Sequence, residues 1–516
     1  MLVKTEKLAL DSAMLHIGST RQYFVDNLII ESVQNIARKI HRPERSADGP
    51  VLVKDKPWEH VPYFTVSSWR VVYDPSEEIY KCWYEDWMFK TPLAPGEDLH
   101  DHNTRPSRYL YACSKDGIHW EKPALGIVHE NGESTNIVFG GEEFGSVHSG
   151  YVFFDRSASR EDERYKIFFD HRVGGISRYE IASSADGIHW RPWEDLPRLG
   201  SFGPHLGDVL TISMDQHAKI YRINTRHPRM CDVPPNSGDP FPGTFNPPFY
   251  PEDFSRQNKR RIFQAMSSDF VNWSNLSPIV VPDDNLDNLE DCFYGMTQMP
   301  LGDLWIGFLH VFHMARNTMD VQLVYSRDGS NFQRIEPGQA WLGSGPEGSW
   351  DDCMVNVYGE PVEVGEDLFI YYGGSRNHHD WWIVGDREGL DTEEARDLEK
   401  VRYSLGLARM KRDRFVSVSA FDVREGIIVT RPFRTTGDKL FINAICRPGG
   451  YIRVALTTED GSVLPGFESA SCQTFSGDSV EHQVTWINSP KLNRNGFLKL
   501  QFFLRDADLF SFEWRE

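Results

Sequence analysis

Short runs in which hydrophobic and polar residues alternate dominate the chain, and helical periodicity is almost absent. This period of two predicts β-strands, because successive side chains of a strand point to opposite faces. Five runs end in related turn sequences: Ser114-Lys-Asp-Gly-Ile-His-Trp120, Ser184-Ala-Asp-Gly-Ile-His-Trp190, and weaker copies at 267–273, 326–332 and 410–415. An alternating run that ends in Asp-Gly is typical of a hairpin. We therefore expect five outer-strand turns, each with an aromatic ring that can pack back over its hairpin.

A second pair of alternating runs precedes each turn sequence. The pairs are 69–74 with 80–84, 150–155 with 165–170, 208–214 with 219–224, 291–299 with 304–310, and 352–362 with 368–372. Four strands repeated five times predict an all-β fold, a five-bladed β-propeller. After residue 421 the repeat stops, and short alternating runs split by Gly, Pro and Asp predict a C-terminal β-sandwich.

The predicted organisation therefore has three parts. Residues 1–45 form an N-terminal leader and hairpin that packs on the propeller, residues 46–421 form the propeller, and residues 422–516 form the sandwich. In a propeller, the first strand of each blade begins at one end of the central axis, and the second strand returns to that end. We expect the functional residues at the starts of first strands and at the ends of second strands.

Charged and polar residues are concentrated at these positions. Starts of first strands supply His148, Asp208, Glu290, Asp291 and Asp352, and ends of second strands supply Asp86, Asp170, Arg172, His310, His313, Arg376 and His378. Gathering acids at one mouth is unfavourable unless something uses them, because like charges raise one another's pKa. Glycoside hydrolysis uses such a cluster, since one carboxylic acid protonates the leaving oxygen and a second carboxylate acts as nucleophile or activates water.

We therefore expect an enzyme, a glycoside hydrolase that cleaves a small glycoside or oligosaccharide such as a furanoside. Glu290 or Asp291 would be the general acid, and Asp170 or Asp208 the second carboxylate. Asp352 would stabilise the cationic transition state. Sugars stack on aromatic faces, and the expected platforms are Trp87, Trp381 and Trp382.

The hairpin motifs, the five blades and the acidic strand starts resemble the five-bladed propeller glycosidases, which include invertases and levanases, arabinanases, xylosidases and mannoside phosphorylases. The resemblance covers residues 20–420 and looks closest to bacterial members that open with a segment like Phe24-Val-Asp-Asn-Leu-Ile29. Glu290-Asp291-Cys292 is similar to the Glu-Cys of invertase-like enzymes, but their Asn-Asp-Pro-Asn-Gly and Arg-Asp-Pro segments are missing. Asp26 or Asp86 would then replace the missing first-blade carboxylate.

Two other functions remain open. A phosphorylase would use phosphate in place of water, with Arg172, Arg226, Arg316, Arg376 and His378 as its anion site. A non-catalytic carbohydrate-binding protein would use the propeller only as a platform. No catalytic metal or cofactor is expected, because His310 and His313 lack the helical spacing of a zinc protease, although a calcium ion in the axial channel would be compatible with the acids.

The amino-acid composition limits the classes of binding partner that we expect. The 55 Lys and Arg against 75 Asp and Glu give a net charge of −20, which repels nucleic acid and anionic membranes. Seven scattered cysteines contain no CxxC pair, and the N-terminus lacks the apolar run of a secretory signal. We therefore expect a cytoplasmic protein with a carbohydrate substrate, whose exposed sandwich edge could pair with a second copy.

Overall fold

The chain is built from β-strands. The computed structural model describes residues 14–65, 68–88, 106–140, 144–173, 176–200, 206, 209–227, 260–283, 285–379, 398–420, 424–487, 492 and 496–516. Within these ranges helical structure is confined to short 3-10 turns, among them η1 (Glu161–Glu163) and η4 (Leu398–Lys400). No helix in the described ranges has the length and apolarity that membrane crossing requires. The expected all-β class is confirmed.

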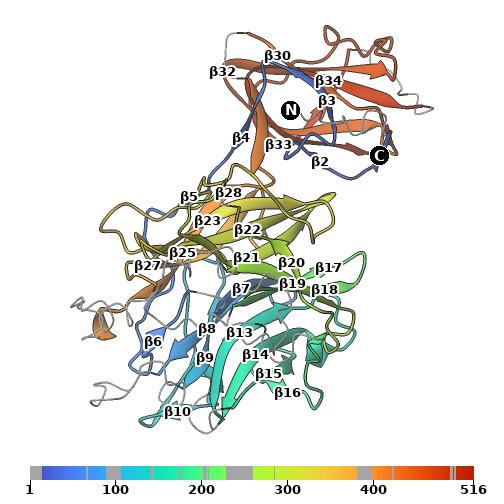
Figure 1. The fold of residues 1–516 in the computed structure, drawn as a ribbon. Helices are drawn as coiled ribbons and strands as arrows, with labels where there is room; N and C mark the ends of the chain where they lie inside the picture. Colours follow the sequence, from blue (N-terminus) through green and yellow to red (C-terminus); the bar gives the residue numbers. More distant parts are fainter. Residues whose placement is uncertain are drawn as a thin grey trace, which may run out of the picture.

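Five successive groups of strands repeat one antiparallel arrangement (Figure 1). We call them units 1 to 5. Unit 1 contains β7 (Trp69–Asp74), β8 (Ile79–Trp87), β9 (Ser107–Ser114) and β12 (Ile137–Gly140), with β6 (Val61–Pro62) on the end of β8. Unit 2 contains β13 (Ser146–Phe154), β14 (Tyr165–Val173), β15 (Ile176–Ser184) and β16 (Arg191–Pro192). Unit 3 contains β17 (Leu210–Asp215), β18 (Ile220–His227), β19 (Arg261–Ser267) and β20 (Ser277–Val280).

The last two units share one sheet through a single parallel pair, Met319 with Met354. Unit 4 contains β21 (Asp291–Leu301), β22 (Leu304–His313), β23 (Thr318–Ser326) and β24 (Gln333–Arg334). In unit 5 the first strand is broken into β25 (Met354–Asn356) and β26 (Val362–Val364), followed by β27 (Asp367–Ser375) and β28 (Tyr403–Lys411). Its outer strand is β5 (Glu44–Arg45), which comes from the beginning of the chain. A small hairpin of β10 (His129–Glu130) and β11 (Glu133–Ser134) is inserted between β9 and β12 of unit 1.

The remaining strands form one ten-stranded sheet. It combines the N-terminal strands β1 (Leu15–Gly18), β2 (Gln22–Tyr23), β3 (Ile30–Gln34) and β4 (Ala37–Ile40) with β29 (Val416–Ala420), β30 (Gly426–Thr430), β31 (Phe433–Thr435), β32 (Lys439–Thr458), β33 (Asp478–Val484) and β34 (Leu498–Arg515). The leading segment therefore does not pack on the units as one hairpin: β1–β4 pair inside this sheet, and only β5 joins a unit. By the same pairing, β29 belongs to this sheet although it precedes residue 421.

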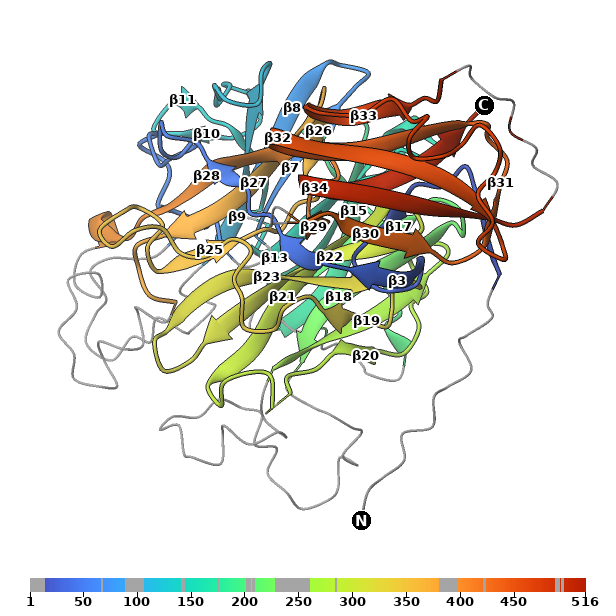
Figure 2. The same ribbon diagram turned by 90° about the horizontal axis from the view of Figure 1, so that it is seen from above.

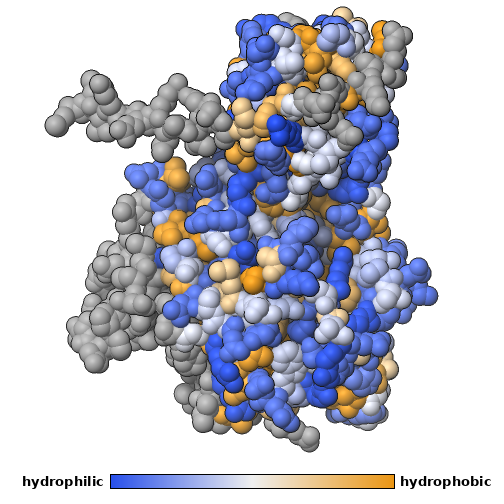
Figure 3. Space-filling view, turned by 90° about the vertical axis from the view of Figure 1, so that its right-hand side faces the viewer, coloured by the Kyte–Doolittle hydropathy of each residue, from blue (hydrophilic) through white to orange (hydrophobic). Residues whose placement is uncertain are grey.

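The ten-stranded sheet lies beside units 4 and 5, with β22, β23 and β28 directly below it in Figure 1. In Figure 2, which is seen from above, β32 and β34 lie in front of the units. The Trp341 indole N–H donates to the His41 carbonyl (2.9 Å), and Arg327 forms an ion pair with Asp26 (2.7 Å). On the face that Figure 3 shows, hydrophobic side chains form small patches among hydrophilic ones.

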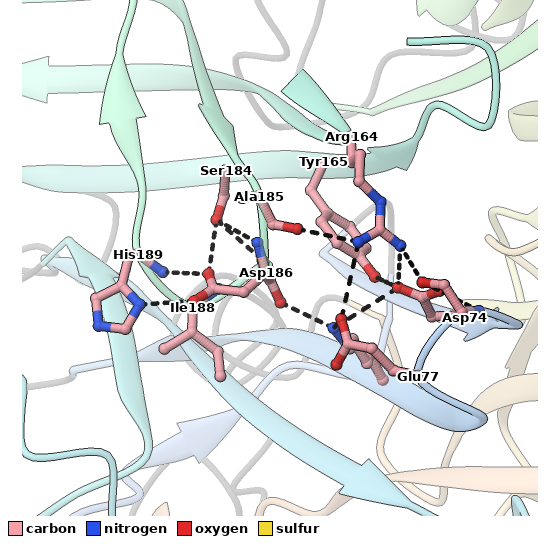
Figure 4. Close-up of polar contacts among 12 residues, drawn as sticks. Asp74, Glu77, Arg164, Tyr165, Ser184, Ala185, Asp186, Ile188 and His189 are labelled. Atoms are coloured by element: carbon pink, nitrogen blue, oxygen red, sulfur yellow. Dashed lines mark hydrogen bonds and ion pairs between the residues drawn. The ribbon is translucent and has the colours of Figure 1, made fainter. Parts of the chain in front are cut away.

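The repeated Ser-x-Asp-Gly turns follow the third strand of their units, as expected, and each is closed by its own side chains. In unit 2 the Ser184 hydroxyl accepts from the Gly187 N–H, and Asp186 accepts from the N–H groups of Ile188 and His189 (Figure 4). Gly187 has a φ of +77°, the left-handed conformation for which the motif uses glycine. The motif therefore fixes a tight turn at the end of β15.

The aromatic rings after the turns of units 1 and 2 reach the adjacent unit. Trp120 of unit 1 lies edge-on to Tyr371 of unit 5 (ring centroids 5.9 Å apart), and Trp190 of unit 2 approaches Phe139 of unit 1 (6.4 Å). In unit 3 Trp273 packs on Phe270 of its own turn, as expected (ring centroids 5.6 Å apart), and also contacts Phe168 of unit 2 (6.1 Å). The motif joins units together.

Each turn contacts the second strand of the preceding unit. The Gly187 carbonyl accepts from Trp83 of unit 1 (2.6 Å), and the Gly117 carbonyl of unit 1 accepts from Tyr371 of unit 5 (2.8 Å). In units 3, 4 and 5 the corresponding contacts are Phe270 with Phe168 (6.5 Å between ring centroids), the Gly329 carbonyl with Arg222 (3.5 Å), and Phe415 with Phe308 (6.0 Å). The contacts run through all five units and return from unit 1 to unit 5.

Candidate active site

The antiparallel registers bring the predicted strand ends together within each unit. In unit 2 the start of β13 pairs with the end of β14, Ser146 opposite Arg172, and in unit 4 Asp291 pairs with His313. We call this end of the units the mouth end. Side chains of different units meet there, because Glu85 of unit 1 binds His148 of unit 2, and Tyr63 of unit 1 packs edge-on against Tyr403 of unit 5 (5.0 Å).

Glu85 is a fully enclosed carboxylate at the mouth end. It has no exposed surface, and it accepts from the His148 ring (2.8 Å), the Trp87 indole N–H (2.7 Å) and the Ser149 N–H (3.2 Å). Burial alone would raise the pKa of Glu85, but the His148 ring and the hydrogen bonds outweigh it and hold the pKa below its usual value. Glu85 is therefore an anionic anchor that fixes Trp87 and His148.

Asp170 lies one strand away from this anchor. It is the ladder partner of His148, so their Cα atoms are about 5 Å apart. The Asp170 carboxylate forms an ion pair with the Arg172 guanidinium (2.6 Å), and both lie at the end of β14. The mouth thus holds two carboxylates from neighbouring units, one fully enclosed and the other beside a cation.

Aromatic rings lie beside the Glu85–His148 pair. Trp87 stacks on Tyr63, with ring centroids 3.9 Å apart and an interplanar angle of 23°, and its ring centroid lies 5.6 Å from that of His148. Trp87 was expected here. Tyr63 was not, because β6 is only two residues long and the Val61-Pro-Tyr sequence has no alternation to follow.

A second polar group joins units 3, 4 and 5. The Arg226 guanidinium lies over the Tyr294 ring at 3.7 Å, Arg260 lies 5.0 Å from the same ring, and the Tyr294 hydroxyl contacts the His379 imidazole. Tyr294 occupies the irregularity in register between Phe293 and Gly295 at the start of β21. Sequence analysis missed Tyr294 and Arg260, and a bulge of this kind leaves no signal in hydrophobic periodicity.

Asp291 and His313 pair as neighbouring strand ends. The His313 ring contacts Asp291 (2.6 Å) through one nitrogen and Asp320 (3.1 Å) through the other. Burial opposes the charged ring, but the hydrogen bonds to the two carboxylates prevail and raise the pKa of His313 to about 10. Burial likewise opposes ionisation of Asp291, yet the bond to His313 lowers its pKa. Asp291 is thus held as an anion beside a cation, an unfavourable state for the expected general acid.

The raised pKa of His313 predicts a pH-dependent contribution to stability. The folded protein keeps the proton up to about pH 10, whereas the unfolded chain releases it near the ordinary value of 6.5. The free energy of unfolding lost in His313→Gln should therefore be largest below pH 6.5 and should shrink as the pH rises toward 10. Urea titrations at several pH values measure it. His217→Gln, at an exposed histidine, should give no such trend.

Several predicted residues do not join these groups. Asp86 is fully buried and faces the opposite side of β8 from Glu85, where it accepts from the His60 N–H (2.9 Å) and pairs with Arg108 (3.2 Å). Burial raises the pKa of Asp86 to about 7, with Arg108 opposing the shift. Asp26 lies at the far end of unit 4, bound to Arg327. His310 is buried against the Val357 backbone, and burial lowers its pKa to about 3.

The other predicted residues occupy turns or the surface. Glu290 accepts from the Ala315 N–H (2.8 Å), and Asp352 from the Gly348 N–H (2.8 Å). Arg376 and His378 are exposed. Asp208, Trp381 and Trp382 lie outside the described residues. Within the described ranges, no group of three or more His, Cys, Asp or Glu side chains is arranged to hold a metal ion.

Comparison with known proteins gives structural similarities only. No family model matches the sequence, and no curated protein matches it. A β-1,2-mannobiose phosphorylase from Listeria innocua is 13% identical, with 73% of this chain and 97% of that chain covered at a TM-score of 0.45. A putative glycoside hydrolase from Bacteroides ovatus is 14% identical (72% and 97% covered, TM-score 0.43). Both TM-scores lie below 0.5.

Proposed function

We propose that the five units are the blades of a five-bladed β-propeller, and that the ten-stranded sheet is its β-sandwich partner. Three observations support the propeller. The turn contacts pass from unit to unit and return from unit 1 to unit 5, β5 completes the last unit as its outer strand, and first strands of all five units line one cavity. A ring of sheets removes exposed strand edges, which is the physical advantage of such closure.

We propose that the protein is a glycoside hydrolase whose site is the mouth end. The main support for this proposal is the contact between units 1 and 2 through the Glu85–His148 pair. Asp170 is the ladder partner of His148, and the stacked rings of Trp87 and Tyr63 lie beside the pair. Carboxylates next to an aromatic platform are what a sugar with a cationic transition state requires.

Each residue at the mouth has a distinct role in this proposal. Glu85 keeps His148 and Trp87 in place and stays ionised. Asp170, held by Arg172, is the carboxylate that attacks the sugar or activates water. Asp291 contributes only negative charge to the site, because His313 holds it as an anion.

A phosphorylase is the second candidate, and one feature favours it. Arginines collect at the mouth end, among them Arg172 beside Asp170, and Arg226 and Arg260 around Tyr294. Guanidinium groups bind phosphate through paired N–H donors, and such a group of cations would also suit a substrate that carries a carboxylate.

A panel of natural and aryl glycosides, assayed with and without inorganic phosphate, tests both candidates. A hydrolase releases free sugar at the same rate in both buffers, whereas a phosphorylase makes sugar phosphate only when phosphate is present. If sugars bind by calorimetry but none turns over in either buffer during long incubation, the hydrolase proposal fails and the protein is a carbohydrate-binding module.

A further inference from the structure

A cavity of about 580 Å³ lies at the end of the units opposite the mouth end. Its wall includes Val72 of β7, Phe153 of β13, Met214 of β17 and Met299 of β21, so four first strands contribute, and the segment 360–363 adds unit 5. These positions lie at the far ends of the first strands from His148 and Asp291. The volume is within the range of small-molecule sites. The cavity is therefore separate from the proposed active site.

Among the described residues that line this cavity, Arg70 is the only arginine that is more than nine-tenths buried. The residue is 6% exposed, and its Nε and Nη1 atoms are buried and have no hydrogen-bond acceptor. Its Nη2 atom lies 3.6 Å from the Glu360 carboxylate, too far for a hydrogen bond. Buried donors without an acceptor are unfavourable, and Arg70 lines the cavity, so an occupant that accepts from its guanidinium would be stabilised there.

The surroundings hold Arg70 in this position. Its guanidinium lies 5.6 Å from the centre of the Tyr151 ring, a cation–π arrangement. Gly359 faces the Nη1 atom, and a Cβ at residue 359 would approach that nitrogen at 2.6 Å, closer than side chains normally come. The absence of a side chain at Gly359 therefore leaves room for the Arg70 head group.

Charge and polarity indicate what the occupant is. Arg70 and Arg156 line the cavity together with Glu360 and Glu363, so the charges of the lining balance. A lining with no excess positive charge disfavours a phosphate dianion more strongly than an occupant with a single negative charge beside Arg70. The Val72, Phe153 and Met299 walls favour a carbon skeleton over a bare inorganic ion.

We propose that this cavity binds a small organic monocarboxylate, whose carboxylate accepts from Arg70 and whose apolar part contacts the first strands. Such a ligand would touch all five units. Its binding should therefore raise the melting temperature of the whole chain, because a ligand that binds only the folded state stabilises it.

Calorimetry on the full chain tests the proposal with three probes: benzoate, its neutral relative benzamide, and inorganic phosphate. Benzoate should bind at least tenfold more tightly than either of the others. Arg70→Met should weaken benzoate binding about tenfold or more, because charge-assisted hydrogen bonds are lost. Equal binding of benzoate and benzamide, stronger binding of phosphate, or undiminished binding in Arg70→Met would overturn the proposal.

A second variant acts in the opposite direction and does not remove the buried arginine. Glu360→Gln removes the competing carboxylate and should tighten benzoate binding about two- to fivefold. Weaker binding in Glu360→Gln would contradict the assignment. Arg160→Met, at an exposed arginine, is the matched control and should bind benzoate like the wild type.

The two sites can be distinguished with one further pair of measurements. Asp170→Asn should keep benzoate binding although it loses turnover, and Arg70→Met should keep turnover although it loses benzoate. If Asp170→Asn also loses benzoate binding, the carboxylate binds at the mouth end and the second site does not exist.

Discussion

Asp170→Asn is expected to lower the turnover of any glycoside that the protein cleaves by about a thousandfold. The substitution keeps the size of the side chain and can still accept from Arg172, but it removes the negative charge that attacks the sugar or activates water. The loss should appear in kcat, because the charge matters most when the transition state becomes cationic. Release of reducing sugar under saturating substrate measures it.

The matched control is Asp162→Asn in the same unit. Asp162 lies in the surface turn η1, where it pairs with Arg160 and Arg191, so this variant should keep full activity. Asp170→Asn with more than a tenth of wild-type kcat, and an unchanged melting temperature, would remove Asp170 from the chemistry.

Gly187→Ala should destabilise the protein by about 3 kcal/mol. Two effects combine: an alanine at a φ of +77° is strained, and its Cβ would lie inside contact distance of the Trp83 ring in unit 1. The Trp83 indole would be displaced from the Gly187 carbonyl that it binds at 2.6 Å. Urea unfolding followed by tryptophan fluorescence reports the change.

Gly126→Ala separates the two effects. Gly126 has nearly the same φ, +72°, but nothing lies within 4 Å of an added Cβ. This variant should lose only the conformational part, about 1 kcal/mol. Equal losses in Gly126→Ala and Gly187→Ala would mean that the contact between units 1 and 2 does not contribute to stability.

The repeat is the part of the fold that local sequence predicts well. Alternating runs and Asp-Gly turns depend on neighbours two or three residues apart, so the third strands and their closing turns appear where the pattern places them. The role of the turn in joining units was not visible, because the partner of Gly187 is Trp83, about a hundred positions earlier in the chain.

The candidate site was predicted less completely for the same reason. Glu85 and Asp86 are adjacent acids at one strand end, and nothing in their local sequence separates them. In the structure Glu85 faces unit 2 and binds His148, whereas Asp86 faces away and pairs with Arg108. Which face of β8 meets unit 2 depends on how the units pack.

The amino-acid sequence by itself determined the strands, the turns and the ends at which acids and histidines collect, because these follow from side-chain alternation and from backbone preferences of Asp and Gly. Tertiary structure alone decided that β1–β4 leave the units for the C-terminal sheet, that Tyr294 meets Arg226 and His379, and that Arg70 faces a cavity. Those contacts join residues far apart in the chain, so they depend on which surfaces meet when the sheets assemble.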